Sequence, residues 1–204
     1  PYNKRQEVLA KKVQRGEIRS KDGKVLAKTK TDSTGKDTRI YPYDEIFAPV
    51  VGRISNSMTG IEKQQCYPLL TSHVNPLRQL TNTLKGEKNP GDSVITTLDA
   101  KLQTIAYQAL GNHKGAVVAI EPSTGKVLAM VSKPSYDPNT VAKNWSSLIK
   151  DSNDDSKLVN RATQGLYPPG STFKVLTAME YMIENPQTYR DFNYRCKGTD
   201  TVAG

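Results

Sequence analysis

The sequence is poor in the residues that build disulfide frameworks and metal sites. Its 204 residues include two cysteines, Cys66 and Cys196, and two histidines, His73 and His113. A disulfide framework needs more cysteines than this, and the histidines stand apart without metal-ligand spacing. The sequence therefore excludes a disulfide-stapled module and indicates no metal site. We expect no cofactor, and a single disulfide is left open.

Long apolar runs are also missing. No stretch of about 18 or more apolar residues occurs, so the sequence predicts no transmembrane helix, and no signal-peptide pattern opens it. Hydrophobic residues still make up 36% of the chain, which is enough to bury a core in one large or two small domains. We expect a globular protein.

Positive charge is plentiful but unevenly placed. The formal net charge is +9, and residues 1–30 alone hold ten Lys or Arg against three Asp or Glu. Nucleic-acid binding would fit a basic arm, but zinc spacing, a basic helix with heptads and aromatic-rich RNA-binding motifs are missing. We expect no nucleic-acid partner. A solvated arm, or one near an anionic polymer or lipid headgroups, fits better.

The first part of the chain reads as mainly β structure. Asp22 and Gly23 predict a hairpin turn between two short strands, and the apolar run at 46–51 predicts further β structure. Residues 61–80 are predicted to be helical in part. A Pro- and Gly-containing loop at 82–92 marks a boundary. We therefore predict one domain over residues 1–90 and a second over residues 91–204.

The second part opens with clearer signals. Asp99 is a candidate helix cap, and an apolar stripe after it predicts a helix that ends at Gly111. Residues 115–121 and 126–132 predict two strands joined by a Pro-Ser-Thr-Gly turn. Because both runs are almost continuously apolar, we expect a buried central pair. The whole pattern indicates an α+β fold.

Ser171 and Lys174 carry the strongest chemical signal. Residues 168–170 oppose helix formation, whereas apolar residues recur at helical spacing over 172–183, so Ser171 lies at a helix start. Positions three apart share a helix face, which brings the Lys174 amine near the Ser171 hydroxyl. Burial by apolar neighbours would lower the pKa of the lysine. We therefore predict Ser171 as nucleophile and Lys174 as general base, with first-turn N–H groups favouring developing negative charge.

A Ser-x-x-Lys tetrapeptide is common and needs this context. It occurs three more times, in a polar loop, in a tight turn and before a polar run, at Ser33/Lys36, Ser123/Lys126 and Ser147/Lys150. Only the Ser171 occurrence joins helix-breaking residues to a helix start with apolar neighbours. Other enzyme classes fit less well. Gly165 and Gly170 have P-loop spacing, but the lysine that should follow is Ser171, and no Gly-x-Ser-x-Gly elbow is present.

Short segments that run in order from residue 15 to residue 174 carry a family resemblance. They are Arg15–Ile18 with Asp22-Gly23, Gly60–Glu62, Ile95–Asp99, Gly115–Met130, Tyr136–Asn139, Asn160-Arg161 and Tyr167–Lys174. In this order the segments resemble the class B penicillin-binding proteins, which are bacterial cell-wall transpeptidases, and among them the compact A type. A bifunctional class A protein would carry a glycosyltransferase domain where this chain has its basic, β-rich arm.

The resemblance implies a fold and an activity. The fold would be a β-rich, non-catalytic pedestal followed by the first part of a serine transpeptidase domain, which is β-lactamase-like with a core of helices and antiparallel sheet. The activity would be peptidoglycan D,D-transpeptidation through an acyl-serine intermediate. Ser171 would be the nucleophile and its backbone N–H an oxyanion donor, with Lys174 as base. The partners would be a stem peptide ending in D-Ala-D-Ala and β-lactams.

The resemblance also implies a location and leaves alternatives open. Such proteins lie on the extracytoplasmic face of the bacterial membrane, held by one N-terminal helix that would precede Pro1. The family's Ser-x-Asn and Lys-Thr-Gly elements do not occur between Lys174 and Gly204, so we expect the chain to be inactive alone. One alternative is a non-catalytic pedestal that docks a membrane glycan polymerase. Another is a β-lactam sensor or resistance protein, against which Arg15-Gly16 and Tyr136–Asn139 argue.

Overall fold

The computed structural model describes residues 4–150, 155–195 and 198. The chain divides into two compact units, one up to Gly165 and one from Leu166. None of the helices in the described ranges combines the length and the apolar character that a bilayer crossing needs.

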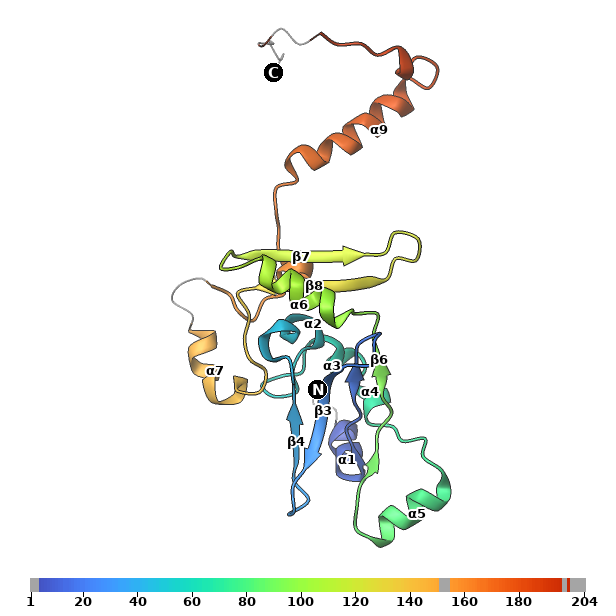
Figure 1. Ribbon diagram of the computed structural model, residues 1–204, viewed down its shortest axis with the longest axis vertical. Coiled ribbons are helices and arrows are strands. Elements are labelled where there is room, and N and C mark those ends of the chain that lie inside the picture. Colours follow the sequence, from blue (N-terminus) through green and yellow to red (C-terminus); the bar gives the residue numbers. More distant parts are fainter. Residues whose placement is uncertain (1–3, 151–154, 196–197, 199–204) are drawn as a thin grey trace. The chain divides into compact units, whose positions relative to one another are not determined.

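The first unit mixes short strands with short helices (Figure 1). Its strands are β1 (Val13–Gln14), β2 (Ile18–Arg19), β3 (Val25–Thr31), β4 (Asp37–Ile40), β5 (Asn89–Pro90), β6 (Val94–Ile95), β7 (Gly115–Ile120) and β8 (Val127–Lys133). Its helices are α1 (Lys4–Lys12), η1 (Asp44–Ile46), α2 (Ala48–Val51), α3 (Gly60–Gln64), α4 (Cys66–Leu69), α5 (Pro76–Leu84), α6 (Ala100–Ala109), α7 (Val141–Ile149) and α8 (Arg161–Gln164).

Strand pairing joins residues that lie far apart in the sequence. A four-stranded sheet has the order β4-β3-β2-β6, in which β2 and β3 are antiparallel and β2 and β6 are parallel. The turn between β2 and β3 holds Gly23 at a φ of 78°, which confirms the hairpin predicted from Asp22 and Gly23. β1 and β5 form a second parallel pair. Segments on both sides of residue 90 therefore share their sheets.

The main core is also continuous across residue 90. It contains nine buried residues: Ile18, Leu26, Ala27, Tyr41, Phe47, Val51, Leu69, Leu98 and Ala100. Val127 of β8 packs against the same cluster. The two predicted parts thus share this core within the first unit. The division into domains at residue 90 stays a prediction.

The apolar run at 46–51 is helical, so the prediction of β structure there is wrong. Residues 44–46 form η1 and residues 48–51 form α2, and Phe47 between them is 2% exposed. Pro49 sits in the first turn of α2, where its missing N–H has no intrahelical acceptor to lose. A short apolar run predicts burial without choosing between helix and strand.

The antiparallel hairpin of β7 and β8 confirms the two strands predicted after Gly111. The prediction that both strands are buried is correct for β8 only. Ala129 and Val131 of β8 are buried, whereas Val118 and Ile120 of β7 are 42% and 53% exposed. One face of β8 packs on α6 through Gln103, whose amide bonds both the N–H and the carbonyl of Met130 at 2.8 Å.

A buried carboxylate ties the strands to α3. Both oxygens of Glu62, which is fully buried, accept from arginines at 2.7 Å, from Arg15 Nε and from Arg39 Nε. Arg39 also donates to the Gly16 carbonyl at 2.7 Å and to Thr29 Oγ1 at 3.0 Å. Arg15 and Arg39 thus stabilise the fold through Glu62, and their charges are not at the surface.

Two features surround this cluster. Gly16 lies so close to the Asp92 carbonyl that a Cβ there would come within 2.0 Å of the oxygen, so this position requires glycine. Tyr41 is 4% exposed, and burial, followed by the negative charge of Glu62, raises the pKa of its hydroxyl. The tyrosine therefore stays neutral beside the carboxylate.

Asparagines join later segments to this framework. The side chain of Asn139 accepts from the Tyr41 N–H at 2.9 Å and donates to its carbonyl at 3.0 Å. Asn160 donates to the Pro49 carbonyl at 3.1 Å and caps α8 by accepting from the Ala162 N–H. Both asparagines belong to the segments that carry the family resemblance, and their role here is to connect elements.

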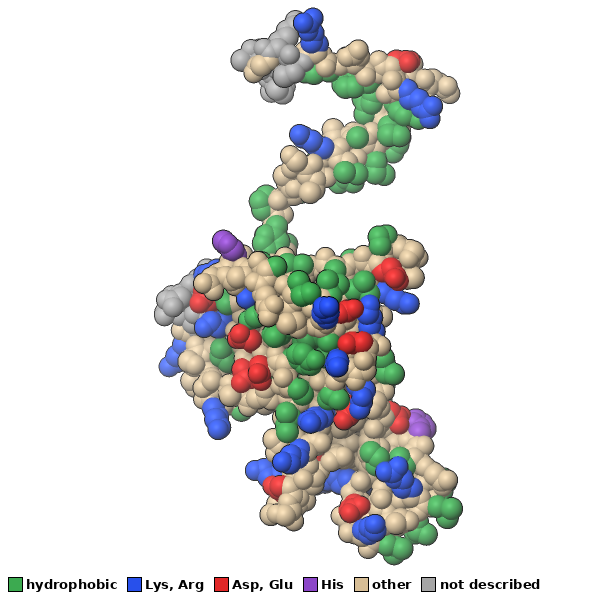
Figure 2. All heavy atoms as spheres, viewed as in Figure 1, with side chains coloured by type: hydrophobic (Ala, Val, Ile, Leu, Met, Phe, Trp, Pro, Cys, Tyr) green, Lys and Arg blue, Asp and Glu red, His purple; other side chains and the backbone are tan. Residues whose placement is uncertain are grey.

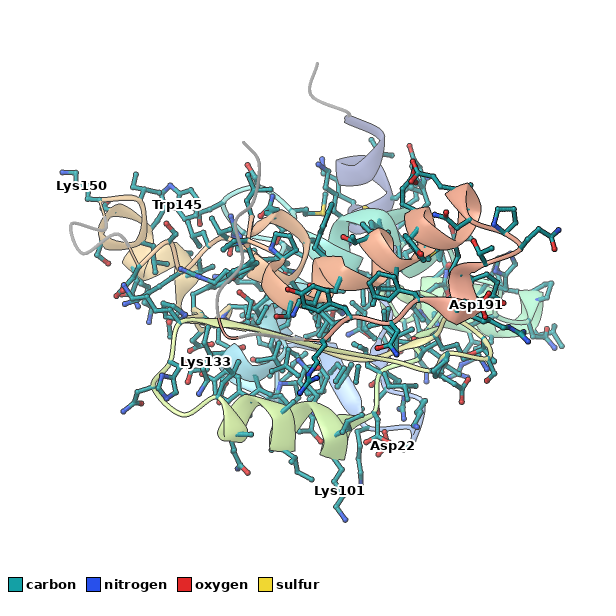
Figure 3. All side chains as sticks on the ribbon, turned by 90° about the horizontal axis from the view of Figure 1, so that it is seen from above. Asp22, Lys101, Lys133, Trp145, Lys150 and Asp191 are labelled. Carbon is teal, nitrogen blue, oxygen red and sulfur yellow. The ribbon has the colours of Figure 1, made fainter. Side chains whose placement is uncertain are left out.

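The sequence patterns do not predict α7, which packs beside Arg53. Trp145 projects from this helix (Figure 3), and the Arg53 guanidinium lies 5.1 Å from its ring centroid. The same guanidinium lies 5.3 Å from the Tyr136 ring centroid and donates to the Tyr136 hydroxyl at 3.2 Å. A buried cation held between two aromatic rings thus fixes α7 to the core.

We predict that Glu62→Ala lowers the free energy of unfolding by about 3–5 kcal/mol, because two largely buried arginines would lose their counter-charge. Glu17→Ala is the matched control, since Glu17 pairs with the more exposed Arg19 and should cost less than about 1 kcal/mol. Chemical denaturation followed by circular dichroism measures both. Equal losses for the two variants would contradict the role given to Glu62.

Asp99 is predicted to stabilise α6 in a pH-dependent way. It accepts from the Leu102 N–H at 2.9 Å and pairs with Lys21 at 3.1 Å, and these contacts hold the pKa of its carboxyl below the usual range. Asp99→Ala should cost about 1 kcal/mol at neutral pH. Because the folded-state pKa is lowered, this contribution is present above the unfolded pKa of about 3.9 and is lost as the pH falls through the folded value.

Thermal melting of the wild type, Asp99→Ala and Asp99→Asn between pH 7 and pH 2 checks this expectation. Asparagine keeps the cap acceptor, so Asp99→Asn should lose less stability at neutral pH than the alanine variant. A difference between wild type and Asp99→Ala that stays constant down to the lowest pH would contradict the charged cap.

Candidate active site

Ser171 and Lys174 lie in the second unit, at a junction of two helical segments. The two segments are η2 (Gly170–Phe173) and α9 (Lys174–Glu184), and a third, η3 (Tyr189–Asp191), follows further along the chain (Figure 1). Gly170 has a φ of 53°, a conformation that glycine adopts without strain, and it turns the chain into η2. The helix predicted next to Ser171 is confirmed, and it ends at Glu184 with Asn185 as its C-cap.

The backbone sets the spacing of the two candidate groups. The Lys174 N–H donates to the Ser171 carbonyl, which closes one helical turn between them. Residues three apart in such a turn lie on one side of the helix. In the described part of the chain no hydrogen bond joins the Ser171 hydroxyl to the Lys174 amine. The structure thus brings the two residues to the same turn, and their catalytic roles stay a prediction.

The predicted apolar burial of Lys174 is wrong for this structure. Its neighbours Phe173, Val175 and Leu176 are 54%, 64% and 55% exposed, and α9 buries none of its residues. The helical spacing of these apolar residues correctly predicted the helix. It could not predict what covers them, because burial depends on the surfaces that pack against the helix and not on its own pattern.

An apolar cavity of about 470 Å³ lies beside Lys174. Its lining residues come from α9 and the segment after it: Lys174, Thr177, Ala178, Tyr181, Met182, Tyr189 and Phe192. The rings of Tyr181 and Phe192 meet edge to face with centroids 5.1 Å apart and form its wall. No sequence pattern singles out these aromatics. Their separation along the chain gives no local pattern.

Other groups with possible chemistry lie elsewhere. Cys66 is buried and unpaired within the described ranges, whereas Cys196 is outside the described residues. His73 Nδ1 lies 2.5 Å from an oxygen of Asp92 on the surface of the first unit. The described residues hold no group of three or more His, Cys, Asp or Glu that could bind a metal ion.

Two family models match the chain. The penicillin binding protein transpeptidase domain matches residues 115–200, and the penicillin binding protein A dimerisation domain matches residues 15–94. The chain belongs to the penicillin-binding proteins. The transpeptidase match includes Ser171 and Lys174, and the dimerisation match includes the Glu62 cluster.

Relatives of this penicillin-binding protein chain are peptidoglycan D,D-transpeptidases by name. The chain is 41% identical over 182 residues to PbpA of Mycobacterium tuberculosis, a match that covers 80% of this chain and 36% of that protein. It is 48% identical over 94 residues to MrdA of Escherichia coli, covering 44% of this chain and 14% of that protein. The chain thus spans little more than a third of the first relative's length.

Solved penicillin-binding proteins share the fold. The imipenem acyl-enzyme complex of penicillin-binding protein A from M. tuberculosis has 36% identity and a TM-score of 0.73, covering 86% of this chain and 43% of that one. Pseudomonas aeruginosa PBP2 in complex with WCK 5153 has 33% identity and a TM-score of 0.69, covering 93% of this chain and 44% of that one. These likenesses confirm the predicted α+β class.

Proposed function

We propose that this chain supplies the nucleophile and the base of a serine D,D-transpeptidase that cross-links peptidoglycan stem peptides. The observation that carries the proposal is the Ser171–Lys174 turn at the start of α9, inside the region that matches the transpeptidase domain. Because the chain spans about a third of PbpA, the activity is proposed for the whole protein.

The proposed reaction is acyl transfer in two steps. Ser171 Oγ attacks the carbonyl of the penultimate D-Ala while Lys174 accepts its proton, and the peptide bond to the terminal D-Ala breaks as that amine takes the proton. An amine of a neighbouring stem then attacks the ester, which forms the new peptide bond and frees Ser171. The Ser171 N–H, which donates to no acceptor among the described residues, is free to bind the oxyanion.

The base role adds a requirement. A lysine amine accepts a proton only while it is neutral, and withdrawal from water favours the neutral form. We therefore propose that the exposed residues Phe173, Val175 and Leu176 are covered in the active protein. The apolar cavity beside Lys174 supports this, since its lining, with Tyr181 and Phe192 in edge-to-face contact, offers an apolar surface that a further segment could cover.

β-Lactams are the proposed inhibitors. A β-lactam carbonyl resembles the D-Ala-D-Ala end, and the amine released by attack stays tethered to the acyl group, so the ester persists. The imipenem acyl-enzyme of M. tuberculosis penicillin-binding protein A supports this proposal for Ser171, given 36% identity over most of this chain.

A binding role is proposed for the first part of the chain. Residues 15–94 match a dimerisation domain, which favours a docking function for the predicted pedestal at 1–90 over a catalytic one. We propose a membrane glycan polymerase as its partner and the extracytoplasmic face of the membrane as its location, with the N-terminal part of the transpeptidase domain at 91–204.

We predict that the complete gene product forms a covalent penicillin adduct at Ser171. Intact-mass spectrometry should show an increase by the full mass of the drug, because no group leaves, and peptide mapping should place it on the Tyr167–Lys174 segment. Ser171→Ala should abolish the adduct. Ser123→Ala, which alters another Ser-x-x-Lys sequence, is the matched control and should acylate normally. An adduct that persists in Ser171→Ala would exclude the proposed nucleophile.

Lys174→Ala is predicted to lower the acylation rate by about a hundredfold or more while the fold is retained, since general-base catalysis is worth about 10²–10⁴. Stopped-flow competition with a fluorescent penicillin measures the rate. Lys126→Ala, in the turn between β7 and β8, serves as control. Unchanged acylation in Lys174→Ala would remove this residue from the base role and leave the Ser171 assignment standing.

A further inference from the structure

Helix α5 carries its apolar side chains on the outside. Leu77, Leu80 and Leu84 are 75%, 59% and 80% exposed, and their spacing of three and four residues places them in one stripe. Hydrophobic side chains gather over α5 at the lower edge of Figure 2. An amphipathic helix that packs only within its own protein has its apolar stripe against the core.

The orientation of α5 is set by polar contacts on its opposite side. Gln79 donates to the Val74 carbonyl at 3.1 Å, and Asn82 donates to the side-chain oxygen of Asn89 at 3.0 Å. Asn75 caps the first turn by accepting from the Leu77 N–H at 2.9 Å. The first and third of these bonds are local to the helix start, whereas the bond from Asn82 to Asn89 ties the helix to β5 and so turns its polar side toward the first unit. Polar residues thus occupy the inward side of α5, and the leucines on its other side face outward.

Positive charge borders the leucine stripe. Arg78 and Lys85 are seven residues apart, so they lie on one side of the helix beside the leucines, and neither forms an ion pair within the described ranges. Residues 73–88 contain one acidic residue, Glu87.

More positive charge lies close to α5. The strand after it, β5, pairs with β1, which directly follows the exposed Lys11 and Lys12 of α1. Because the pair is parallel, the end of α1 and the segment that links α5 to β5 enter it from the same end.

We propose that α5 lies on an anionic lipid bilayer, with the leucine stripe at the acyl-chain boundary and the bordering cations on headgroup phosphates. An amphipathic helix with leucines on one face and Lys or Arg at its edge has the composition of an interfacial helix. Arg and Lys stems reach past the apolar stripe to place their charges at the headgroup level. The adjoining Lys11 and Lys12 add to the same attraction.

Other occupants fit the charges and the leucines less well. Two copies of this chain would bring like charges together around the stripe, which opposes self-association through α5. An anionic polymer would bind the cations and leave the leucines in water. A bilayer satisfies both at once. This proposal is independent of acyl transfer, because vesicle binding and penicillin acylation are measured separately.

Vesicle flotation of the purified 204-residue chain tests the proposal. The chain should bind vesicles that contain phosphatidylglycerol, bind pure phosphatidylcholine vesicles far less, and lose affinity as salt rises. The affinity of the variant Leu77→Ser/Leu80→Ser/Leu84→Ser for these vesicles should fall by about tenfold or more. Arg78→Gln/Lys85→Gln should also weaken binding. Ile149→Ser, at a residue that is 57% exposed on α7, is the matched control and should bind as the wild type does.

Circular dichroism and thermal melting check that the variants stay folded, and the single variant Leu84→Glu repeats the test should the triple variant unfold. Three results would overturn the proposal. One is no binding to phosphatidylglycerol vesicles at low salt. Another is binding that the leucine variants leave unchanged, which would indicate attraction by the basic arm alone. The third is leucine-dependent self-association in sedimentation experiments, or capture of a purified protein partner by the stripe, without vesicle binding.

Discussion

The first unit depends on one buried carboxylate. Glu62 holds Arg15 and Arg39, and through them the end of β1, the β3–β4 hairpin and α3 meet at a single point. Burying three charges costs solvation free energy, which such a cluster recovers only when every group is paired in good geometry. The cluster therefore contributes more to selecting one arrangement of short strands and helices than to total stability. Short elements need such a device, since β1, β2, β5 and β6 have two residues each.

The positive charge of the chain divides into two kinds. Arg15, Arg39 and Arg53 are turned inward, where planar guanidinium groups bind a carboxylate or lie against aromatic rings. Lysines such as Lys11 and Lys12 remain at the surface with Arg78 and Lys85. Net charge alone does not make this distinction. The cations turned inward are all arginines, because a guanidinium is less strongly hydrated than an ammonium and is easier to bury, whereas the surface positions hold both residue types.

Local signals predicted local structure, and distant partners decided the rest. The helix start at Ser171, the cap at Asp99 and the turn at Gly23 were predictable because a few adjacent residues determine each of them. The helical form of 46–51 and the exposure of Val175 and Leu176 were not, because both depend on what packs against the segment. The Glu62 cluster joins residues up to 47 apart, and no sequence pattern links them. For the site, sequence yielded the two candidate residues and their shared turn, but neither their surroundings nor the aromatic wall.

The parallel pairing of Ile18 with Val94 also bears on how the chain acquires its structure during synthesis. The N-terminal hairpin of β2 and β3 can form as soon as it leaves the ribosome, but its sheet gains β6 only after about sixty further residues have been added, because β3 ends at Thr31 and β6 begins at Val94. The core stays open for longer still, since Leu98, Ala100 and Val127 complete it. Contacts between such distant residues slow folding and expose apolar surface to other chains in the meantime. Assembly of this fold is thus governed by contact order, and a nascent chain stopped short of β8 would lack part of its own interior.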